Sequence, residues 1–523
     1  DSDKQPGWQC WIDRGGTFTD VIALAPDGSQ RVRKQRSVAP EMYDDAAVAC
    51  ITAILDASPQ FERTIDSIRI GTTVATNALL ERKAPPVALL LTEGFEDLLE
   101  IADQRRDQLF GLALSKRDLP VHEILTTPAR VSATGEEISA HDLEALQNAF
   151  VQLANDGVQH LAISLLHNWQ HPKHELEAKQ IAKAAGIAHV TCSHETAPVQ
   201  GYLQRTETTW VDTWLTPVLQ SYIRGFKHAL ANVASVTRID FMQSHGGLDE
   251  ADKVRGKDAV LSGPAGGLVA LAREGNGLDL NALIGMDMGG TSTDICHWQG
   301  RFEQRTDNEV GGYRLHTPML RLDTIASGGG SLLTCVDGRL QVGPESAGAQ
   351  PGPAAYGLAG PATLTDANVV LGRLPAEVLP RVFGHDGEQP LDAPASHQAL
   401  DHLRQQHATA LEQYSVEALA QRWLDIGVEQ IAGAAHQVAL RHGSDLRSFV
   451  LGAFGGAAGQ IACAVASRLG IQKIWLHPRA GVLSALGIGI AQHRRLFEAS
   501  VDHPLKTCWA ALDSQREDHS NSL

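Results

Sequence analysis

The sequence predicts an α/β fold in which two related halves face one ligand. The stretch IDRGGTFTDVIAL at residues 12–24 recurs as MDMGGTSTDICHW at residues 286–298. Each copy carries an aspartate after apolar residues, a Gly-Gly-Thr turn and a second aspartate before a β-prone run, which predicts a strand, a tight turn and a strand. Elsewhere short apolar strands alternate with helical stretches, which is the pattern of α/β proteins.

The repeated turn has the composition of a phosphate-binding turn. Paired glycines lack a Cβ, so backbone amides and threonine hydroxyls can approach phosphate oxygens closely. Asp13 and Asp287 would repel bare phosphate, which predicts a hydrated Mg²⁺ between the carboxylates and the phosphate. Asp20 and Asp294 are expected to brace the turns. The candidate phosphate-binding residues are Gly15, Gly16, Thr17, Gly289, Gly290 and Thr291.

A plain hairpin with glycines at positive φ is the alternative for these turns. A single copy would favour that interpretation. Two copies with the same residue types at the same offsets favour a shared ligand.

Composition narrows the class of protein. The chain has 523 residues, 43% of them hydrophobic, with a net charge of −17. This length predicts two or more domains. The acidic balance argues against a nucleic-acid or anionic-membrane surface, although local basic sites remain compatible with it.

Cysteine usage and hydropathy predict a soluble cytoplasmic protein. The seven cysteines are dispersed without CxxC spacing, which favours reduced thiols over a disulfide framework. No window offers about 18 uninterrupted apolar residues, and residues 1–9 lack the charged and apolar segments of a signal peptide.

The first half alternates helices and strands. A strand is predicted to run into a helix over residues 68–82, and Pro172 is expected in the first turn of a helix. The other predicted helices span residues 40–57 and 143–154, and the other predicted strands span residues 87–91 and 161–166.

The second half begins after a long helical region. Residues 200–230 are predicted to be helical, with an interruption near Pro217, and to bridge the halves. SGPAGG at residues 262–267 is predicted to be a loop, and residues 326–360 an ordered functional loop. A strand is predicted at residues 239–243, a helix at 415–442 and a strand at 449–454. We expect domains at residues 1–200 and 201–505, followed by a polar tail at 506–523.

A third glycine-rich turn, FGGAAG at residues 454–459, lies between a predicted strand and helix. Gly455 and Gly456 would let a helix N-terminus and bare backbone lie against a nucleotide, although packing alone explains such a turn equally well. The three turns together resemble those of actin, heat-shock ATPases and sugar kinases. The resemblance implies two duplicated ribonuclease-H-like domains flanking a nucleotide cleft, with ATP and Mg²⁺ held by the first two turns.

The chain resembles a narrower family, the hydantoinase A and 5-oxoprolinase family, over residues 11–490. The matching stretches are DRGGTFTD, GTTVATNALLER, SGPAGG, MDMGGTSTD, ASGGGS, VGPESAGAQPGP and TDANVVLGRL. The form DRGGTFTD and the segment VFGHDGEQPLD favour 5-oxoprolinase over hydantoinase. The chain departs from the family pattern at His245, Ala458 and Ile461, and the methyl group of Ala458 is expected to crowd the nucleotide.

The resemblance implies ATP-dependent activation of a cyclic amide such as 5-oxoproline or a hydantoin. Phosphorylation of the carbonyl oxygen would create a leaving group and allow water to open the ring. The chain is shorter than family members, so a hydantoinase B-type subunit or a missing C-terminal half is the expected partner, and a homo-oligomer is left open. The alternatives are ketone activation, as in acetone carboxylase, and a nucleotide-binding regulatory or assembly module without turnover.

Further polar residues are candidates for ligand contacts. Thr72, Thr73 and Asn77 at a strand-to-helix junction are candidates for substrate binding, with helix capping as the alternative. Gly328 and Gly329 are expected to line an anion cradle of backbone amides, with a loop that binds nothing as the alternative. Glu345 and Asp366 are plausible polar contacts.

Other reactive residue types lack the context of a site. His171 and His174 have no third ligand at a familiar spacing, so a surface or capping role is favoured over a metal. Cys192 and His194 are sequence neighbours without a nucleophile elbow. The Walker A pattern does not occur, which argues against a P-loop protein.

Overall fold

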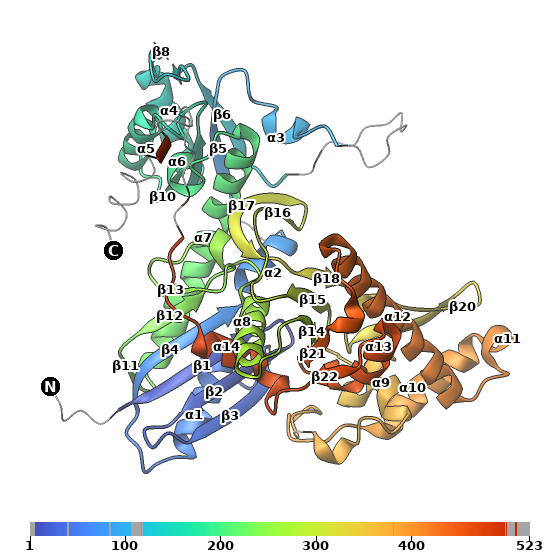
Figure 1. The fold of residues 1–523 in the computed structure, drawn as a ribbon. Coiled ribbons are helices and arrows are strands. Elements are labelled where there is room, and N and C mark those ends of the chain that lie inside the picture. The colour runs from blue at the N-terminus through green and yellow to red at the C-terminus, as the bar shows by residue number, and fades with distance from the viewer. Residues whose placement is uncertain are drawn as a thin grey trace.

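The computed structural model describes residues 6–38, 41–82, 85–105, 117, 119–379, 381–496, 498 and 508–509. Two α/β units lie side by side, and a smaller unit stands at one end of the first (Figure 1). Each of the three units is built on its own sheet.

The first sheet has the strand order β13-β12-β4-β1-β2-β3, with β11 beside β4. Strands β1, β2 and β3 form an antiparallel meander, whereas β4 and β12 run parallel to β1 and to each other. The strands are β1 (Trp8–Arg14), β2 (Phe18–Leu24), β3 (Gln30–Arg36), β4 (Thr64–Thr72), β11 (Ser235–Val236), β12 (Ile239–Met242) and β13 (Leu248–Glu250).

The second sheet repeats this arrangement in the order β18-β15-β14-β21-β22. Its first three strands are antiparallel, and β21 and β22 run parallel to β14. In each sheet, the next strand of that sheet along the chain pairs with the first strand of the meander: β4 pairs with β1, and β21 pairs with β14. The strands are β14 (Leu283–Met288), β15 (Thr293–Trp298), β18 (Asp323–Ile325), β21 (Val450–Phe454) and β22 (Lys473–Trp475).

A third, fully parallel sheet is inserted between β4 and β11, in the order β10-β9-β5-β6. Its strands are β5 (Val87–Thr92), β6 (Glu123–Thr127), β9 (His160–Ser164) and β10 (His189–Cys192). The same insert holds β7 (Arg130–Val131), β8 (Glu137–Ser139), α3 (Leu98–Ile101), α4 (Leu143–Asn155), α5 (Lys173–Ala184) and α6 (Ser193–Thr196).

Two helices connect the first and second sheets. Helix α8 (Ser262–Gly277) leads from the first sheet into β14, and α14 (Leu483–Ile490) returns from the second sheet to pack on β1. The two helices approach so closely that a Cβ on Gly266 would lie 2.7 Å from the Ser484 carbonyl oxygen. Glycine is therefore needed where these helices cross.

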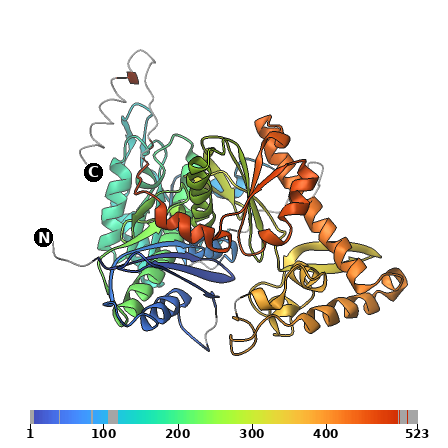
Figure 2. The ribbon, with the colours of Figure 1, turned by 60° about the horizontal axis from the view of Figure 1, so that its bottom comes forward.

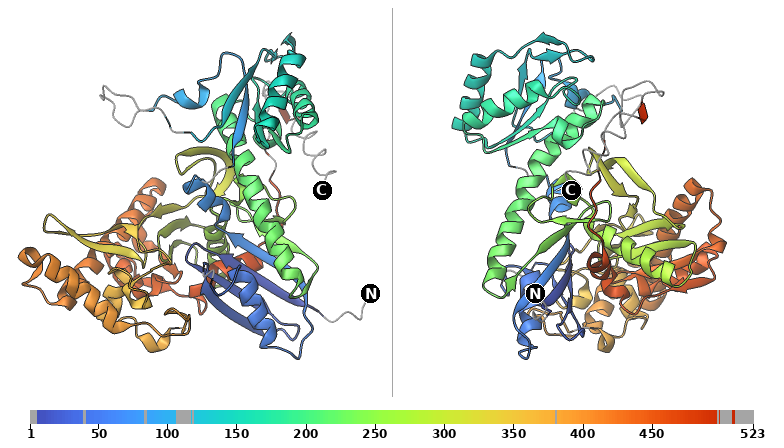
Figure 3. Two further views of the ribbon diagram at one scale, coloured as in Figure 1. Left: turned by 180° about the vertical axis from the view of Figure 1, so that it is seen from behind. Right: turned by 60° about the vertical axis from the view of Figure 1, so that its left-hand side comes forward.

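Helix α7 (Tyr202–Ala231) runs from the inserted sheet along the first sheet (Figure 3). The first sheet is also covered by α1 (Ala46–Asp56) and α2 (Val74–Leu80). The predicted interruption at Pro217 is wrong, because α7 continues through this residue. Trp214, Leu215 and Leu219 are buried around it, and their packing outweighs the helix-breaking tendency of proline.

The second half carries an outer lobe, residues 331–411, which follows β18 in the chain and lies beside α12 (Figure 1). The lobe contains β19 (Ser331–Val336), β20 (Arg339–Ser346), α9 (Leu364–Val370), α10 (Ala393–Gln406), α11 (Ala408–Leu411) and the short 3₁₀ helices at Ala354–Tyr356 and Ala376–Val378. The remaining elements are β16 (Gln304–Val310), β17 (Tyr313–Leu320), α12 (Val416–His442), α13 (Ala462–Leu469) and 3₁₀ helices at Lys257–Ala259, Leu446–Ser448, Ala458–Gln460 and Ala480–Val482.

Most predicted elements are confirmed, and two stretches predicted as loops are not. SGPAGG forms the first turns of α8, and residues 331–346 of the expected functional loop form the β19–β20 hairpin. Asp337 and Gly338 both have positive φ between these strands, which fits a two-residue hairpin turn.

The expected domain boundary between residues 200 and 201 falls within the chain of the first sheet. Strands β1 to β4 of that sheet precede the boundary, and β11 to β13 follow it. The tail at 506–523 lies outside the described residues except for 508 and 509.

The seven cysteines are all free, as their spacing predicts. Among the helices that the structure describes, none combines the length and the apolar character needed to cross a membrane.

Candidate functional site

The two repeated turns have the same backbone geometry. Asp13 pairs with Asp20 across β1 and β2, and Asp287 pairs with Asp294 across β14 and β15. The Gly15 amide donates to the Phe18 carbonyl oxygen at 3.0 Å, and in the second copy Gly289 donates to Ser292 at the same distance. The repeat in the sequence is thus a repeat in structure.

The tips of the two hairpins face each other. A Cβ placed on Gly290, in the second turn, would lie 3.3 Å from Thr17 Oγ1 in the first turn. Gly16 and Thr291 are exposed at the tips, so their backbone is open to a ligand. The ionised form of Asp13 also raises the pKa of Asp287, so the carboxylates of the two halves lie within electrostatic reach.

The first aspartates of the two hairpins, Asp13 and Asp287, are buried carboxyls with raised pKa values. Burial and the neighbouring Asp20 raise the pKa of Asp13 to about 7, although Lys34 opposes the shift. Asp13 Oδ1 is buried and accepts no hydrogen bond from the residues that the structure describes. Burial, Asp294 and Asp13 also raise the pKa of Asp287. A positive partner would favour the ionised form of these carboxylates at neutral pH.

The second aspartate of each hairpin has its own partner. Lys34 Nζ pairs with Asp20 at 2.7 and 2.9 Å and lies 5.1 Å from the centre of the Phe18 ring. Asp294 accepts a hydrogen bond from the Thr324 hydroxyl, and burial raises its pKa to about 6. These contacts agree with a bracing role for Asp20 and Asp294.

The donor set at the hairpin tips fits a hydrated Mg²⁺ ion. A hard divalent cation takes oxygen ligands, and the unpartnered oxygen of Asp13 is such a ligand. Asp287 lies within electrostatic reach of Asp13, so an ion beside Asp13 would also act on Asp287. A cation would also favour the ionised form of both carboxylates, whose pKa values burial raises.

The N-terminus of α8 meets the first hairpin, which the sequence did not predict. A Cβ on Gly263 would lie 3.1 Å from Asp13 Oδ1, so SGPAGG brings bare helical backbone beside this carboxylate. Ser484 of α14 donates a hydrogen bond that lowers the pKa of Asp287. Ser484 lies far from Asp287 in sequence, and no local pattern marked it.

The expected anion cradle at residues 327–331 is wrong, because its amides are already used. Gly329 and Gly330 donate to the carbonyl oxygens of Gly289 and Gly290 at 3.0 and 2.6 Å, and Gly328 donates to Ser331 Oγ at 2.8 Å. A Cβ on Gly328 would lie 2.7 Å from the Ser292 nitrogen. The loop braces the second turn from behind, and a nucleotide contact of Gly328 or Gly329 by another route stays a prediction.

The third turn also lies against the second hairpin. Gly455 has a φ of +91°, and a Cβ there would lie 2.6 Å from the Met288 carbonyl oxygen. Gly456 is exposed, with open space where its Cβ would be. Ala458 and Ile461 are 0% and 2% exposed and belong to the core beneath α12 and α13. The expected crowding of a nucleotide by Ala458 is therefore wrong, because its methyl group is buried in this core.

The proposed substrate residues differ in availability. Thr72 is buried, and its hydroxyl accepts from the Val74 amide at 3.2 Å, just before α2. Thr73 and Asn77 are half-buried, and Thr73 donates to the Arg14 carbonyl oxygen beside the first turn. Only Thr73 and Asn77 are therefore open to a ligand among these three.

The remaining candidates have structural partners. Asp366 is buried, caps α9 and accepts from Ser396 and two backbone amides of Ala354–Tyr356. His245 is buried in the turn between β12 and β13, where Nδ1 accepts from the Gly247 amide at 3.2 Å. Glu345 lies in β20 of the outer lobe, and nothing in the structure defines a ligand for it.

The insert holds the group Glu175, Cys192 and His194, whose potential ligand atoms lie within 4.8 Å of one another. The buried Glu175 carboxylate already accepts from the Leu165 amide at 2.9 Å and from His194 Nδ1 at 2.6 Å. Burial raises the pKa of the Cys192 thiol well above its usual range, which disfavours a nucleophilic thiolate. The group is satisfied as a structural network.

Comparison with known proteins identifies the family. The model described as hydantoinase/oxoprolinase N-terminal region matches residues 9–186, and the model described as hydantoinase/oxoprolinase matches residues 205–496. 5-oxoprolinase 1 of Arabidopsis thaliana is 37% identical over 517 residues, which cover 92% of this chain and 41% of that protein. The chain thus spans less than half the length of this relative.

Two ATP-dependent enzymes share the fold. Caprolactamase subunit alpha of Pseudomonas jessenii is 33% identical over 91% of this chain and 69% of its own. The crystal structure of that ATP-dependent caprolactamase matches with a TM-score of 0.80 and 30% identity, over 98% of this chain and 76% of that chain. Nucleotide-free acetone carboxylase has the same TM-score and coverage at 20% identity, which shows the fold alone.

The two family models together cover most of the chain, and the relatives agree with them in identity and fold. The chain belongs to the hydantoinase/oxoprolinase family.

Proposed function

We propose that this chain is the ATP-binding and carbonyl-activating part of an enzyme that opens a cyclic amide, with 5-oxoproline as the favoured substrate. The facing aspartate hairpins carry this proposal, because their tips are close, open and short of positive charge. The names of its relatives, 5-oxoprolinase and caprolactamase, support a cyclic amide as the substrate class.

We further propose that the two sheets are the duplicated ribonuclease-H-like domains of the actin, heat-shock ATPase and sugar-kinase superfamily. The matching strand orders and the equivalent positions of the hairpins support this assignment. In this view α8 and α14 are the paired helices between the domains, and the inserted sheet is an addition to the first domain.

The residues at the cleft have distinct proposed roles. Asp13 and Asp287 hold Mg²⁺ through water, and the ion neutralises phosphate charge during transfer. The amides of Gly16 and Gly290 and the hydroxyls of Thr17 and Thr291 orient the β- and γ-phosphates, while Gly15 and Gly289 shape the two turns through their own amide hydrogen bonds. Gly456 lies on the nucleotide side of the third turn. Thr73 and Asn77 face the substrate.

The proposed reaction has three steps. The lactam carbonyl oxygen attacks the γ-phosphorus, the bond to the β-phosphate oxygen breaks, and ADP leaves. A first water then adds to the activated carbon, and the bond from carbon to ring nitrogen breaks as the nitrogen takes a proton, which leaves an acyl phosphate on the opened chain. A second water adds to the same carbon, the bond from carbon to the phosphate oxygen breaks, and phosphate leaves with the original carbonyl oxygen. Because amide resonance makes the free carbonyl a poor electrophile, phosphorylation supplies the leaving group that the hydrolytic steps need.

Completion of the reaction is proposed to need a second component. The relative from Pseudomonas jessenii is named as a subunit alpha, and the plant relative is more than twice as long as the matched region. We propose a B-type subunit or C-terminal half that supplies the hydrolytic step. A module without turnover gains no specific support, since Ala458 and Ile461 are core residues. Ketone activation stays an alternative, because the similarity to acetone carboxylase shows the fold alone.

Isotope transfer tests the proposal. With 5-oxoproline labelled by ¹⁸O in the ring carbonyl, ATP, Mg²⁺ and a B-type partner, the released phosphate should carry one ¹⁸O per turnover. Retention of all the label in the product carboxylates would refute carbonyl phosphorylation. Asp13→Asn and Asp287→Asn should each abolish label transfer, and Asp445→Asn, at an exposed surface ion pair, should not.

A further inference from the structure

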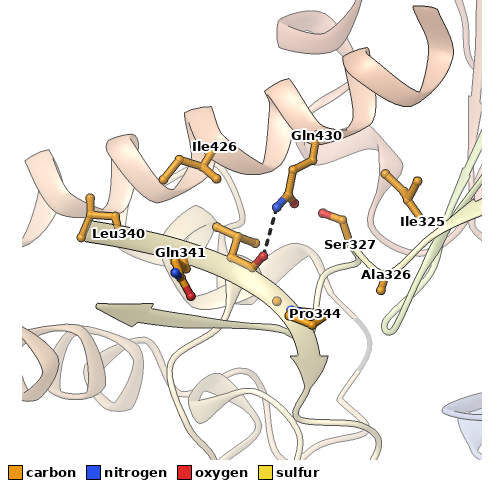
Figure 4. Close-up of a pocket in the computed structure, with 10 residues that line it drawn as sticks. Ile325, Ala326, Ser327, Leu340, Gln341, Pro344, Ile426 and Gln430 are labelled. Carbon is orange, nitrogen blue, oxygen red and sulfur yellow. Dashed lines mark hydrogen bonds between the residues drawn. The ribbon is translucent and has the colours of Figure 1, made fainter. Parts of the chain in front are cut away.

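A cavity of about 550 Å³ lies behind the second hairpin, away from the hairpin tips. It is bounded by α12, by one strand of the outer lobe and by the loop that braces the second turn (Figure 4). The lining residues are Ile325, Ala326, Ser327, Leu340, Gln341, Val342, Gly343, Pro344, Ile426 and Gln430. Its volume suits a small organic molecule.

The lining favours an uncharged ligand with an apolar body. None of the ten lining residues carries a charged side chain. Ile325, Leu340 and Ile426 supply apolar walls on different sides of the cavity. An ion would therefore gain no partner of opposite charge from these lining residues.

Two polar groups in the cavity could hydrogen-bond to one edge of that ligand. Ser327 is 2% exposed, and its hydroxyl has no hydrogen-bond partner among the described residues, although it points into the cavity (Figure 4). Gln430 Nε2 donates to the Val342 carbonyl oxygen at 3.1 Å, which leaves the amide oxygen of Gln430 to accept from a ligand. A hydroxyl donor beside an amide acceptor complements a C=O next to an N–H.

The same serine is tied to the second hairpin. Its carbonyl oxygen accepts a hydrogen bond from the hydroxyl of Thr293, the first residue of β15. The next residue, Gly328, packs on the backbone of Thr291 and Ser292. A molecule bound to the Ser327 hydroxyl would therefore restrain a loop that holds the second turn in place.

We propose that this cavity is a second binding site, for an uncharged small molecule with an amide edge, and that its occupation rigidifies the second hairpin. Binding at this site is independent of the cleft chemistry. An effect of the bound molecule on nucleotide affinity, through the second hairpin, rests on the proposed function.

The test uses the whole chain and 2-pyrrolidinone, an uncharged lactam, as the probe. Saturation-transfer NMR should detect binding, and Ser327→Ala and Gln430→Ala should each weaken it roughly fivefold, the size of one hydrogen bond. Gln421→Ala is the matched control, because Gln421 lies on the same helix but outside the cavity. N-Methyl-2-pyrrolidinone, which lacks the N–H, should bind about as weakly as the probe does to Gln430→Ala.

Asp13→Asn separates this site from the cleft. Probe binding that survives in Asp13→Asn and weakens in Ser327→Ala supports the cavity, even if the chain has no ATP-dependent activity. Hydrogen exchange at residues 289–293 should also slow when the probe is added. No probe binding, equal binding in Ser327→Ala, loss in Asp13→Asn, or unchanged exchange would overturn the proposal.

Discussion

The Phe18 ring of the first hairpin meets the Tyr356 ring of the outer lobe edge to face, with ring centroids 6.3 Å apart and ring planes at 71°. Nearby, a Cβ on Gly387 would lie 3.1 Å from Met42 Cε, so the lobe also touches the loop after β3. Figure 2 shows the lobe reaching toward the first sheet. The two halves therefore touch at the hairpin as well as through α8 and α14.

This ring contact should respond to nucleotide if the halves close on it. A double-mutant cycle with Phe18→Ala and Tyr356→Ala should give a coupling free energy of about 0.5–1.5 kcal/mol in thermal unfolding. The coupling should increase when ATP and Mg²⁺ are added, because ligand binding to both halves favours the closed arrangement.

The pair Trp8 and Phe61 is the control for that cycle. These rings meet at 5.7 Å within the first half, so their coupling should be the same with and without nucleotide. A nucleotide effect of equal size on both pairs would contradict a specific contact across the cleft.

Neutralising Asp13 should stabilise the metal-free protein at alkaline pH. The pKa of this carboxyl is raised from its usual value near 3.8 to about 7, so the unfolded chain releases the proton more readily than the folded one. Stability is therefore lost as pH rises from about 4 to about 7 and stays lower above that range. Asp13→Asn should raise the melting temperature at pH 8 by at least about 2 °C, and much less at pH 4.

Magnesium and a surface carboxyl provide the comparison for Asp13. Excess Mg²⁺ should raise the melting temperature of the parent chain at pH 8 and have little effect on Asp13→Asn. The pKa of Asp445 is lowered to about 2 by its hydrogen bonds with Arg447, so Asp445→Asn should slightly destabilise at pH 8. Equal Mg²⁺ stabilisation of the parent and Asp13→Asn would count against a metal-binding role for Asp13.

Removing Ser484 should move the pH dependence of Mg²⁺-nucleotide binding to higher pH. The Ser484 hydroxyl donates to Asp287 and lowers the pKa of its carboxyl, against the larger effect of burial. In Ser484→Ala the pKa of Asp287 rises further, so a higher pH is needed to ionise it and bind the cation. Binding titrations from pH 5 to 9 should show the shift, and Ser484→Thr should restore the parent profile.

The sequence carried enough local information for the hairpins, but not for what surrounds them. Asp13 and Asp287 lie in turns defined by neighbouring residues, and these formed as predicted. Helix α8 begins with glycines of low helix propensity, and its packing on α14 determines the helix. Ser484 reaches Asp287 only through that packing. The β19–β20 hairpin was missed although Asp337-Gly338 is a recognised turn signal.

The third turn offers the sharpest test of nucleotide contact, because adjacent glycines there have different surroundings. Gly455 has positive φ, and a Cβ would meet Asp287 and Met288, so Gly455→Ala should destabilise the protein by about 1–3 kcal/mol. Gly456 has open space, so Gly456→Ala should leave the melting temperature of the free protein unchanged. If a nucleotide lies against this backbone, Gly456→Ala should still weaken ATP binding several-fold, as measured by equilibrium dialysis. Unchanged ATP affinity in Gly456→Ala would place the nucleotide elsewhere.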